Sequence, residues 1–192
     1  MKEFFLVLAS GSPYRRELLS RLEVPFTTWS PDIDEHALAG ESPRDTARRL
    51  AAAKARAAQA RFPGALIVGS DQVAELDGHP IGKPGNLANA REQLRMMRGR
   101  NVRFHTAVCL LAAERLQEET VTTEVAFREF TDVEAERYLE REPAFDCAGS
   151  AKSEALGIAL LERLRGDDPT ALVGLPLIAL SRMLRGEGIE VP

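Results

Sequence analysis

The residues best suited to chemistry in this chain lie in short polar segments, each beside a turn or an apolar run. The first segment, residues 10–16, has a serine at 12, a proline at 13 and arginines at 15 and 16. Ser12 suits a helix N-cap and Pro13 the first helical position, and the free N–H groups of a first turn attract phosphate. Arg15 and Arg16 add positive charge where an anion would lie. The segment therefore predicts either an anion site or a well-capped surface helix with solvated arginines.

Lys54 is a charged residue in an apolar stripe of a predicted helix. Ser42 and Pro43 suit the start of a long helix that ends near residue 62, and Asp45 completes a start that resembles a capping box. At 100° per residue, Lys54 falls within a stripe formed by Ala47, Leu50, Ala51 and Ala58. A lysine there either snorkels to the edge of the core or points into a cleft that holds an anion or a carboxylate.

Acidic residues occur at two places where they could take part in a reaction. Asp34 and Glu35 lie in a predicted turn, where they are either solvated acids or hard oxygen ligands for a divalent cation. Asp71 follows a short apolar run at 65–69 that predicts a buried strand. Polar residues at the end of such a strand often carry catalytic or ligand groups in α/β folds. Asp71 is thus a candidate for function, and equally for a turn or a helix cap.

Two further segments place lysines close to backbone turns. Lys83 stands between a glycine and a proline, which suits contact with a phosphate and is also typical of a tight surface turn. Residues 148–154 form a loop of small residues whose only charges are Lys152 and Glu154. Because small side chains leave room beside the backbone, this loop predicts the close approach of a ligand.

The elements that must position these residues alternate between extended and helical patterns. Extended runs are expected at 6–9, 26–29, 65–69, 102–111 and 120–130, with a charged loop joining the last two. Helices are expected from residue 13, over 42–62, 86–97 and 131–141, and from 174 to about 186. Strands that alternate with helices around a long hairpin predict an α/β fold with a mixed sheet.

Size and composition restrict the class of protein. The chain has 192 residues, 44% of them hydrophobic, and a formal net charge of −4. These values predict one globular domain over residues 1–192 that can divide into two lobes around a cleft, and they argue against a general nucleic-acid binder. No apolar run approaches the length of a membrane span, and the first residues lack a signal-peptide pattern. We therefore expect a cytoplasmic protein without a membrane partner.

Neither the cysteines nor the histidines predict a metal site. Cys109 and Cys147 stand far apart, which suits buried thiols better than a disulfide framework or a zinc site. His36, His79 and His105 lack the spacing of metal ligands, so they are interpreted as solvated or structural residues.

Taken together, the polar segments resemble the Maf-like nucleoside triphosphate pyrophosphatases, in the same order and across nearly the whole chain. The matching motifs are residues 10–16, 34–35, 54–55, 69–73, 82–84, 152–154 and 174–176. The stretches Ser-Pro-aromatic-Arg-Arg, Gly-Ser-Asp-Gln-Val and Cys-Ala-Gly-Ser-x-Lys-Ser-Glu are similar to the branch that hydrolyses 7-methyl-GTP. The branch that prefers dTTP and UTP typically has arginine, threonine and glutamine in place of Tyr14, Gln72 and Glu154. Tyr14 is a departure, because the 7-methyl-GTP branch often has tryptophan there.

The resemblance implies a fold, a reaction and a cofactor. The fold is a mixed, twisted α/β sheet with flanking helices and two lobes around a deep nucleotide cleft. The reaction cleaves the α–β phosphoanhydride of 7-methyl-GTP to give 7-methyl-GMP and pyrophosphate, with a divalent cation such as Mg²⁺, Mn²⁺ or Co²⁺. A homodimer is expected. The same chemistry on dTTP, UTP or another modified nucleotide remains an alternative, as does a nucleotide-sensing protein without turnover.

The resemblance also implies a role for each candidate residue. Asp71 is the expected general base and a metal ligand, and Glu35 is a ligand of the metal or of water. The residues expected to hold the phosphates are Ser10, Arg15, Lys54 and Lys83. On the base, Tyr14 would stack with the cationic 7-methylguanine ring, and Glu154 would accept its N1–H and exocyclic amine. Gln72 orders the site or touches the sugar or base, and Lys152 is a further substrate-binding residue.

Overall fold

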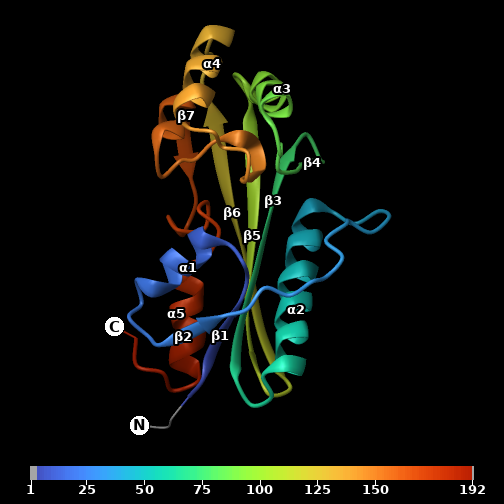
Figure 1. Cartoon of the computed structure of the whole chain (residues 1–192), viewed down its shortest axis with the longest axis vertical. Coiled ribbons are helices and arrows are strands. Elements are labelled where there is room, and N and C mark those ends of the chain that lie inside the picture. The colour runs from blue at the N-terminus through green and yellow to red at the C-terminus, as the bar shows by residue number, and fades with distance from the viewer. Residues whose placement is uncertain (1–3, 192) are drawn as a thin grey trace.

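The computed structural model describes residues 4–191, in which seven strands form one mixed sheet with helices on both faces (Figure 1). The order along the sheet is β2-β1-β3-β5-β6-β7, and β4 pairs with β3. The strands are β1 (Leu6–Ala9), β2 (Phe26–Thr28), β3 (Leu66–Leu76), β4 (His79–Ile81), β5 (Asn101–Ala112), β6 (Arg115–Phe127) and β7 (Leu161–Arg165). Strands β1, β2 and β3 run parallel, whereas β3, β5, β6 and β7 are antiparallel neighbours. The mixed α/β sheet predicted from the sequence is confirmed.

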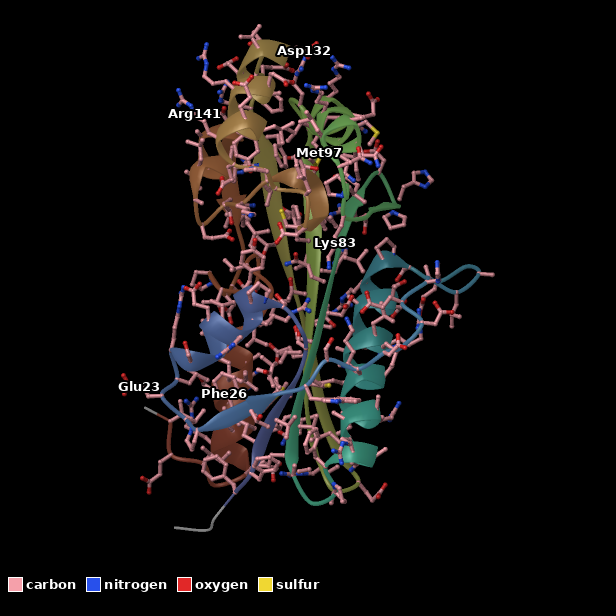
Figure 2. The ribbon with its side chains drawn as sticks, viewed as in Figure 1. Glu23, Phe26, Lys83, Met97, Asp132 and Arg141 are labelled. Carbon is pink, nitrogen blue, oxygen red and sulfur yellow. The ribbon has the colours of Figure 1, made fainter. Side chains whose placement is uncertain are left out.

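The helices form two groups along the long axis of the molecule, and both groups share the long strands (Figure 1). The helical segments are α1 (Pro13–Ser20), α2 (Pro43–Arg61), α3 (Leu87–Met97), α4 (Asp132–Arg141), α5 (Leu177–Gly186) and two short 3₁₀ turns, η1 (Ala148–Ser150) and η2 (Leu156–Leu160). One group consists of α1 and α5 on one face of the sheet and α2 on the opposite face. The other group consists of α3 and α4, and strand β7 lies at the same end of the molecule (Figure 1). Met97 and Asp132 mark this second end, while Glu23 and Phe26 mark the first (Figure 2).

Strand β5 contributes to three hydrophobic clusters, which explains how one sheet supports both groups. Its residues Val108 and Leu110 pack with α1 and α5, and Val102 and Phe104 pack with α3 and α4. On the opposite face, Cys109 belongs to a cluster with the alanines of α2. Because successive side chains of a strand point to opposite faces, a single long strand can bury residues on both sides.

Short-range hydrogen bonds start the helices where the sequence predicts. The side chains of Ser12, Ser42, Asn86 and Thr131 each accept a hydrogen bond from a backbone N–H three residues later, as an N-cap does. Among residues 4–191, no helix has the length and hydropathy needed to cross a membrane.

Strand β3 is longer than predicted, so the expectation that Asp71 lies just past the end of a strand is wrong. The antiparallel partner β5 pairs with β3 from Leu66 to Glu75, and this ladder keeps the polar residues after Gly69 in the extended conformation. Strand β6 likewise begins at Arg115, ahead of the predicted start at 120, because β5 pairs with it along its length. The short strand β7 was not predicted.

The edge of β3 has a gap, and this gap positions the candidate site. On the edge opposite β5, β1 pairs with β3 as far as Gly69, and β4 begins to pair only at Ala74. Residues 70–73 therefore have a strand neighbour on one edge only. Their side chains on both faces of the sheet are next to the open edge.

Candidate active site

A cavity of about 700 Å³ lies at the gap in the edge of β3. Strand β3 supplies Asp71 and Gln72 to its wall, and the segment after β4 supplies Lys83. The remaining predicted residues in the wall come from α1, α2 and the loops that precede these two helices, and they are Ser10, Tyr14, Arg15, Glu35 and Lys54. Lys83 lies near the middle of the long axis, between the two groups of helices (Figure 2). The fold thus brings together residues that lie far apart in the sequence.

Lys54 joins the two candidate carboxylates. Its Nζ lies 2.6 Å from Oδ1 of Asp71 and 2.7 Å from Oε1 of Glu35. The Lys54 side chain is 8% exposed and that of Asp71 is 10% exposed, so most water is excluded from this ion pair. Lys54 reaches across to the carboxylates of the cavity and does not snorkel to the outside. Burial opposes ionisation of Glu35, but the hydrogen bond and charge of Lys54, with Lys83 and Arg15, keep the pKa of Glu35 below its ordinary value.

Arg15 is fixed at the wall of the cavity by a backbone carbonyl. Its Nε donates to the oxygen of Gly174 at 2.8 Å, and Ser70 Oγ donates to the same oxygen at 3.0 Å. Nη1 of Arg15 lies 3.5 Å from Ser10 Oγ, which also accepts from the backbone N–H of Ser12 at 3.1 Å. Burial lowers the pKa of Arg15, and the charges of Asp71 and Glu35 oppose this effect. An arginine remains protonated under these conditions, so the site keeps its cation.

Gln72 holds the segment that precedes α5. Its Nε2 lies 3.0 Å from the carbonyl oxygen of Ala171, 2.9 Å from that of Leu172 and 2.9 Å from Oγ1 of Thr106. Thr106 also donates to the oxygen of Ala171, at 2.8 Å. Gln72 therefore orders the wall of the cavity through its amide nitrogen, and its amide oxygen is the part of the side chain left for a ligand.

Tyr14 contacts the loop between α4 and η1, through a residue that the sequence analysis missed. Its hydroxyl donates to Oδ2 of Asp146 at 2.8 Å, and Nζ of Lys152 lies 3.4 Å from Oδ1 of Asp146 and 5.5 Å from the centre of the Tyr14 ring. Asp146 lines the cavity. The only sequence signal for it is its position directly before Cys147, at the start of a motif of small residues.

Two predicted substrate-binding residues do not form part of the cavity wall. Within the described chain, Lys152 contacts the wall through Tyr14 and Asp146, and Glu154 is exposed. Burial, and then the negative charges of Asp146 and Glu154, raise the pKa of the Cys147 thiol to about 12 against the opposing charge of Lys152. Glu154 thus contributes to the raised pKa of Cys147, a residue of the cavity wall, without itself lining the cavity.

His79 and His105 lie outside the cavity wall, whereas His36, next to Glu35 in the chain, is part of it. His105 is buried, with its ring nitrogens 2.8 Å from Glu75 Oε2 and 2.9 Å from Thr122 Oγ1, and His36 and His79 are exposed. Over residues 4–191, no three side chains of histidine, cysteine, aspartate or glutamate form a group that could hold a metal ion. A cation in this cavity would need oxygen ligands from its substrate in addition to carboxylates.

A mixed α/β sheet whose edge cavity combines several cations with a buried aspartate, joined through a lysine to an exposed glutamate, defines an enzyme that acts on an anionic substrate. The chain belongs to the Maf-like protein family, whose family model matches residues 5–187. It is 60% identical over 189 residues to a 7-methyl-GTP pyrophosphatase of Aromatoleum aromaticum, covering 97% of each chain. It is 61% identical over 188 residues to a 7-methyl-GTP pyrophosphatase of Burkholderia pseudomallei, covering 95% of this chain and 87% of the other.

Similarity to solved structures is weaker. A HAM1 protein from Coxiella burnetii matches with a TM-score of 0.48 and 22% identity, covering 65% of this chain and 73% of the other.

Proposed function

We propose that this chain hydrolyses 7-methyl-GTP to 7-methyl-GMP and pyrophosphate. The observation that carries the proposal is the contact of Lys54 with both Asp71 and Glu35, in the same cavity as Arg15 and Lys83. Hydrolysis of a phosphoanhydride requires cations around the phosphates and a carboxylate beside the attacking water. The names of relatives at 60% and 61% identity supply the choice of 7-methyl-GTP.

In the proposed reaction, water attacks the α-phosphorus and the bond between that phosphorus and the bridging oxygen to the β-phosphate breaks. Asp71 accepts a proton from the attacking water. Arg15, Lys54 and Lys83 hold the phosphate oxygens and offset the negative charge that the leaving pyrophosphate carries. Ser10, next to Arg15, contributes a hydroxyl to the same phosphate site.

A divalent cation fits the donors of this site. Glu35 and Asp71 place carboxylate oxygens 2.7 Å and 2.6 Å from one ammonium group, so the two oxygens already lie close together. Mg²⁺ is commonly bound by one or two carboxylates together with substrate phosphates and water. When bound, such a cation neutralises phosphate charge and lowers the pKa of a coordinated water. Mn²⁺ and Co²⁺ accept similar oxygen ligands.

Recognition of the base is assigned to the Tyr14 end of the cavity. The Tyr14 ring can stack on the cationic ring of 7-methylguanine. Glu154 is the proposed acceptor for N1–H and the exocyclic amine. It is exposed, so this role requires the loop at 152–154 to approach the bound base. Gln72 offers its amide oxygen, and Lys152 contacts the Tyr14 ring.

A substrate panel tests the proposal. Pyrophosphate release is measured with 7-methyl-GTP, GTP, dTTP and UTP, each with Mg²⁺, Mn²⁺ or Co²⁺ and with a chelator. We expect the highest kcat/KM for 7-methyl-GTP and no turnover with the chelator. A preference for dTTP or UTP would support the other branch of the family, and nucleotide binding without pyrophosphate release would support a sensing protein.

Two further proposals rest on the resemblance to the family. We propose a homodimer, which sedimentation of the purified protein tests directly, and a cytoplasmic location, which fractionation of the source cells tests. No nucleic-acid or membrane partner is proposed.

A further inference from the structure

The Tyr14 end of the cavity contains an ion pair between Asp146 and Lys152, and a hydrogen bond from Tyr14 to Asp146 joins the two groups of helices. Tyr14 is in the first turn of α1, whereas Asp146 and Lys152 lie on the segment that follows α4. Asp146 uses both carboxylate oxygens: Oδ2 accepts from the Tyr14 hydroxyl at 2.8 Å, and Oδ1 lies 3.4 Å from Nζ of Lys152. The Lys152 side chain is 19% exposed and that of Asp146 is 55% exposed. The carboxylate therefore remains accessible from the cavity that it lines.

The charges at this end are set by their neighbours. Burial opposes ionisation of Asp146, but the Tyr14 hydrogen bond and the charge of Lys152 outweigh burial and lower the pKa of Asp146. Burial likewise opposes protonation of Lys152, but its interactions with Tyr14 and Asp146 raise the pKa of Lys152. At neutral pH the cluster therefore consists of a carboxylate, an ammonium and a neutral phenol, and the two formal charges cancel.

The position of Lys152 presents a problem for a cationic base. Its ammonium lies 5.5 Å from the centre of the Tyr14 ring, a distance typical of a cation–π contact. A 7-methylguanine ring stacked on Tyr14 would bring a second positive charge close to this ammonium. Without a neighbouring anion, the two like charges would repel each other. Neutral guanine would meet no such repulsion.

We propose that Asp146 is a specificity-determining residue that makes the Tyr14 end of the cavity accept a methylated, positively charged purine in preference to the neutral purine. This inference rests on the proposed function, because it requires a nucleotide base at Tyr14. Asp146 neutralises Lys152 and, through its hydrogen bond, holds the Tyr14 ring at the face of the cavity. The carboxylate acts on the charge of the base, so it distinguishes two nucleotides that differ by a single methyl group.

The experiment measures kcat/KM for 7-methyl-GTP and for GTP with wild type and three variants, at a pH slightly below neutral, where the methylated ring keeps its N1 proton and its net positive charge. Asp146→Asn keeps the shape and an acceptor for Tyr14 but leaves the Lys152 charge uncompensated. We expect the ratio of the two kcat/KM values to fall about two- to fivefold, the range of one cation–π or charge contact at a partly exposed site. Lys152→Met leaves Asp146 uncompensated, so the ratio rises. The double variant returns the ratio towards the wild-type value.

A purely structural role for Asp146 gives a different pattern. In that case Asp146→Asn lowers kcat/KM equally for both nucleotides, or the addition of Lys152→Met to Asp146→Asn does not return the ratio towards the wild-type value. Either result overturns the proposal. Asp167→Asn, which removes one exposed carboxylate outside the cavity wall, is the control and leaves the ratio unchanged. Thermal unfolding of every variant shows whether a loss of activity follows from a loss of fold, and the ratio remains interpretable because both substrates use the same protein.

Failure of the proposed function gives a third, separate pattern. If wild type releases no pyrophosphate from either nucleotide, the proposed function is wrong and the role of Asp146 falls with it. If wild type prefers 7-methyl-GTP but the ratio is the same in Asp146→Asn and Lys152→Met, only the role of Asp146 is wrong.

Discussion

Gly69 of β3 lies so close to Ala51 of α2 that a β-carbon at position 69 would be 2.2 Å from the Ala51 carbonyl oxygen. The same β-carbon would be 2.9 Å from Sγ of Cys109 and 3.0 Å from the β-carbon of Ala55. Position 69 therefore has no room for a side chain. This close approach brings α2 onto the sheet, so that Lys54, one turn beyond Ala51, meets Asp71 on the same face of β3.

Replacing this glycine should damage the site as well as the fold. We expect Gly69→Ala to destabilise the protein by about 1 to 3 kcal/mol, because overpacking at the interface forces α2 away from β3. Since a displacement of about 1 Å can reduce a rate about 100-fold, kcat should fall further than the loss of folded protein explains. Thermal unfolding and pyrophosphate release measure both effects. Gly186→Ala is the control, since its β-carbon would have only one contact, at 3.8 Å; an equally inactive control would contradict the explanation.

Asp71→Asn tests the general base. The amide keeps the shape and a hydrogen bond to Lys54 but cannot accept the proton, so kcat should fall about 100-fold or more while nucleotide still binds. Single-turnover pyrophosphate release and a nucleotide-induced thermal shift separate the two properties. Glu75→Gln, on the same face of β3 but outside the cavity wall, should retain most of its activity. Activity of Asp71→Asn within tenfold of wild type would remove Asp71 from this role.

Lys54→Met tests the cation between the carboxylates. Methionine suits the apolar stripe of α2, so the helix should form, but Glu35 and Asp71 would then face each other without the ammonium. Their mutual repulsion and the lost phosphate contact should raise KM about tenfold or more and lower kcat. Arg48→Met, an exposed position on the same helix, serves as the control. Unchanged kinetics for Lys54→Met would show that the ion pair is structural only.

Glu154→Gln and Tyr14→Ala test the reading of the base. A neutral amide cannot accept both guanine donors with a negative charge, so Glu154→Gln should lower kcat/KM for 7-methyl-GTP far more than for dTTP or UTP. Tyr14→Ala should also reduce the preference for 7-methyl-GTP over dTTP and UTP. The kcat/KM values of both variants with all three nucleotides test these expectations. An equal loss on every substrate would mean that Glu154 serves the metal or the fold.

The pH dependence of stability should test the contacts of Glu41, which hold the loop that carries Glu35. Hydrogen bonds from Arg49 and from the backbone N–H of Leu38 lower the pKa of Glu41 to about 2, and Arg49 also donates to the carbonyl oxygen of His36 at 2.9 Å. Because this pKa is lower in the folded state, Glu41 stabilises the fold above its unfolded pKa of about 4.3 and loses that effect as the pH falls towards 2. Urea unfolding of wild type and Glu41→Gln should therefore converge over this range. A constant difference between the two would exclude the titration of Glu41 as the cause.

By itself, the amino-acid sequence determined the features that depend on neighbouring residues. The N-caps at Ser12, Ser42 and Thr131 were predictable because each hydrogen bond spans three residues. The alternation of helices and strands, and hence the mixed α/β class, followed from the periodicity of apolar residues. The order of the motifs identified the family and most of the residues that line the cavity.

Only the tertiary structure decided the features that depend on distant partners. Strand β3 continues through Asp71 because β5, more than thirty residues later, supplies its hydrogen bonds, and no local signal shows this. Asp146 enters the site through Tyr14, 132 positions away in the chain. Whether Lys54 meets water or a carboxylate was likewise undecided in the sequence, because an apolar stripe shows which face of a helix is buried and not what lies opposite it. The close packing of α2 onto Gly69 brings Lys54 to the carboxylate of Asp71.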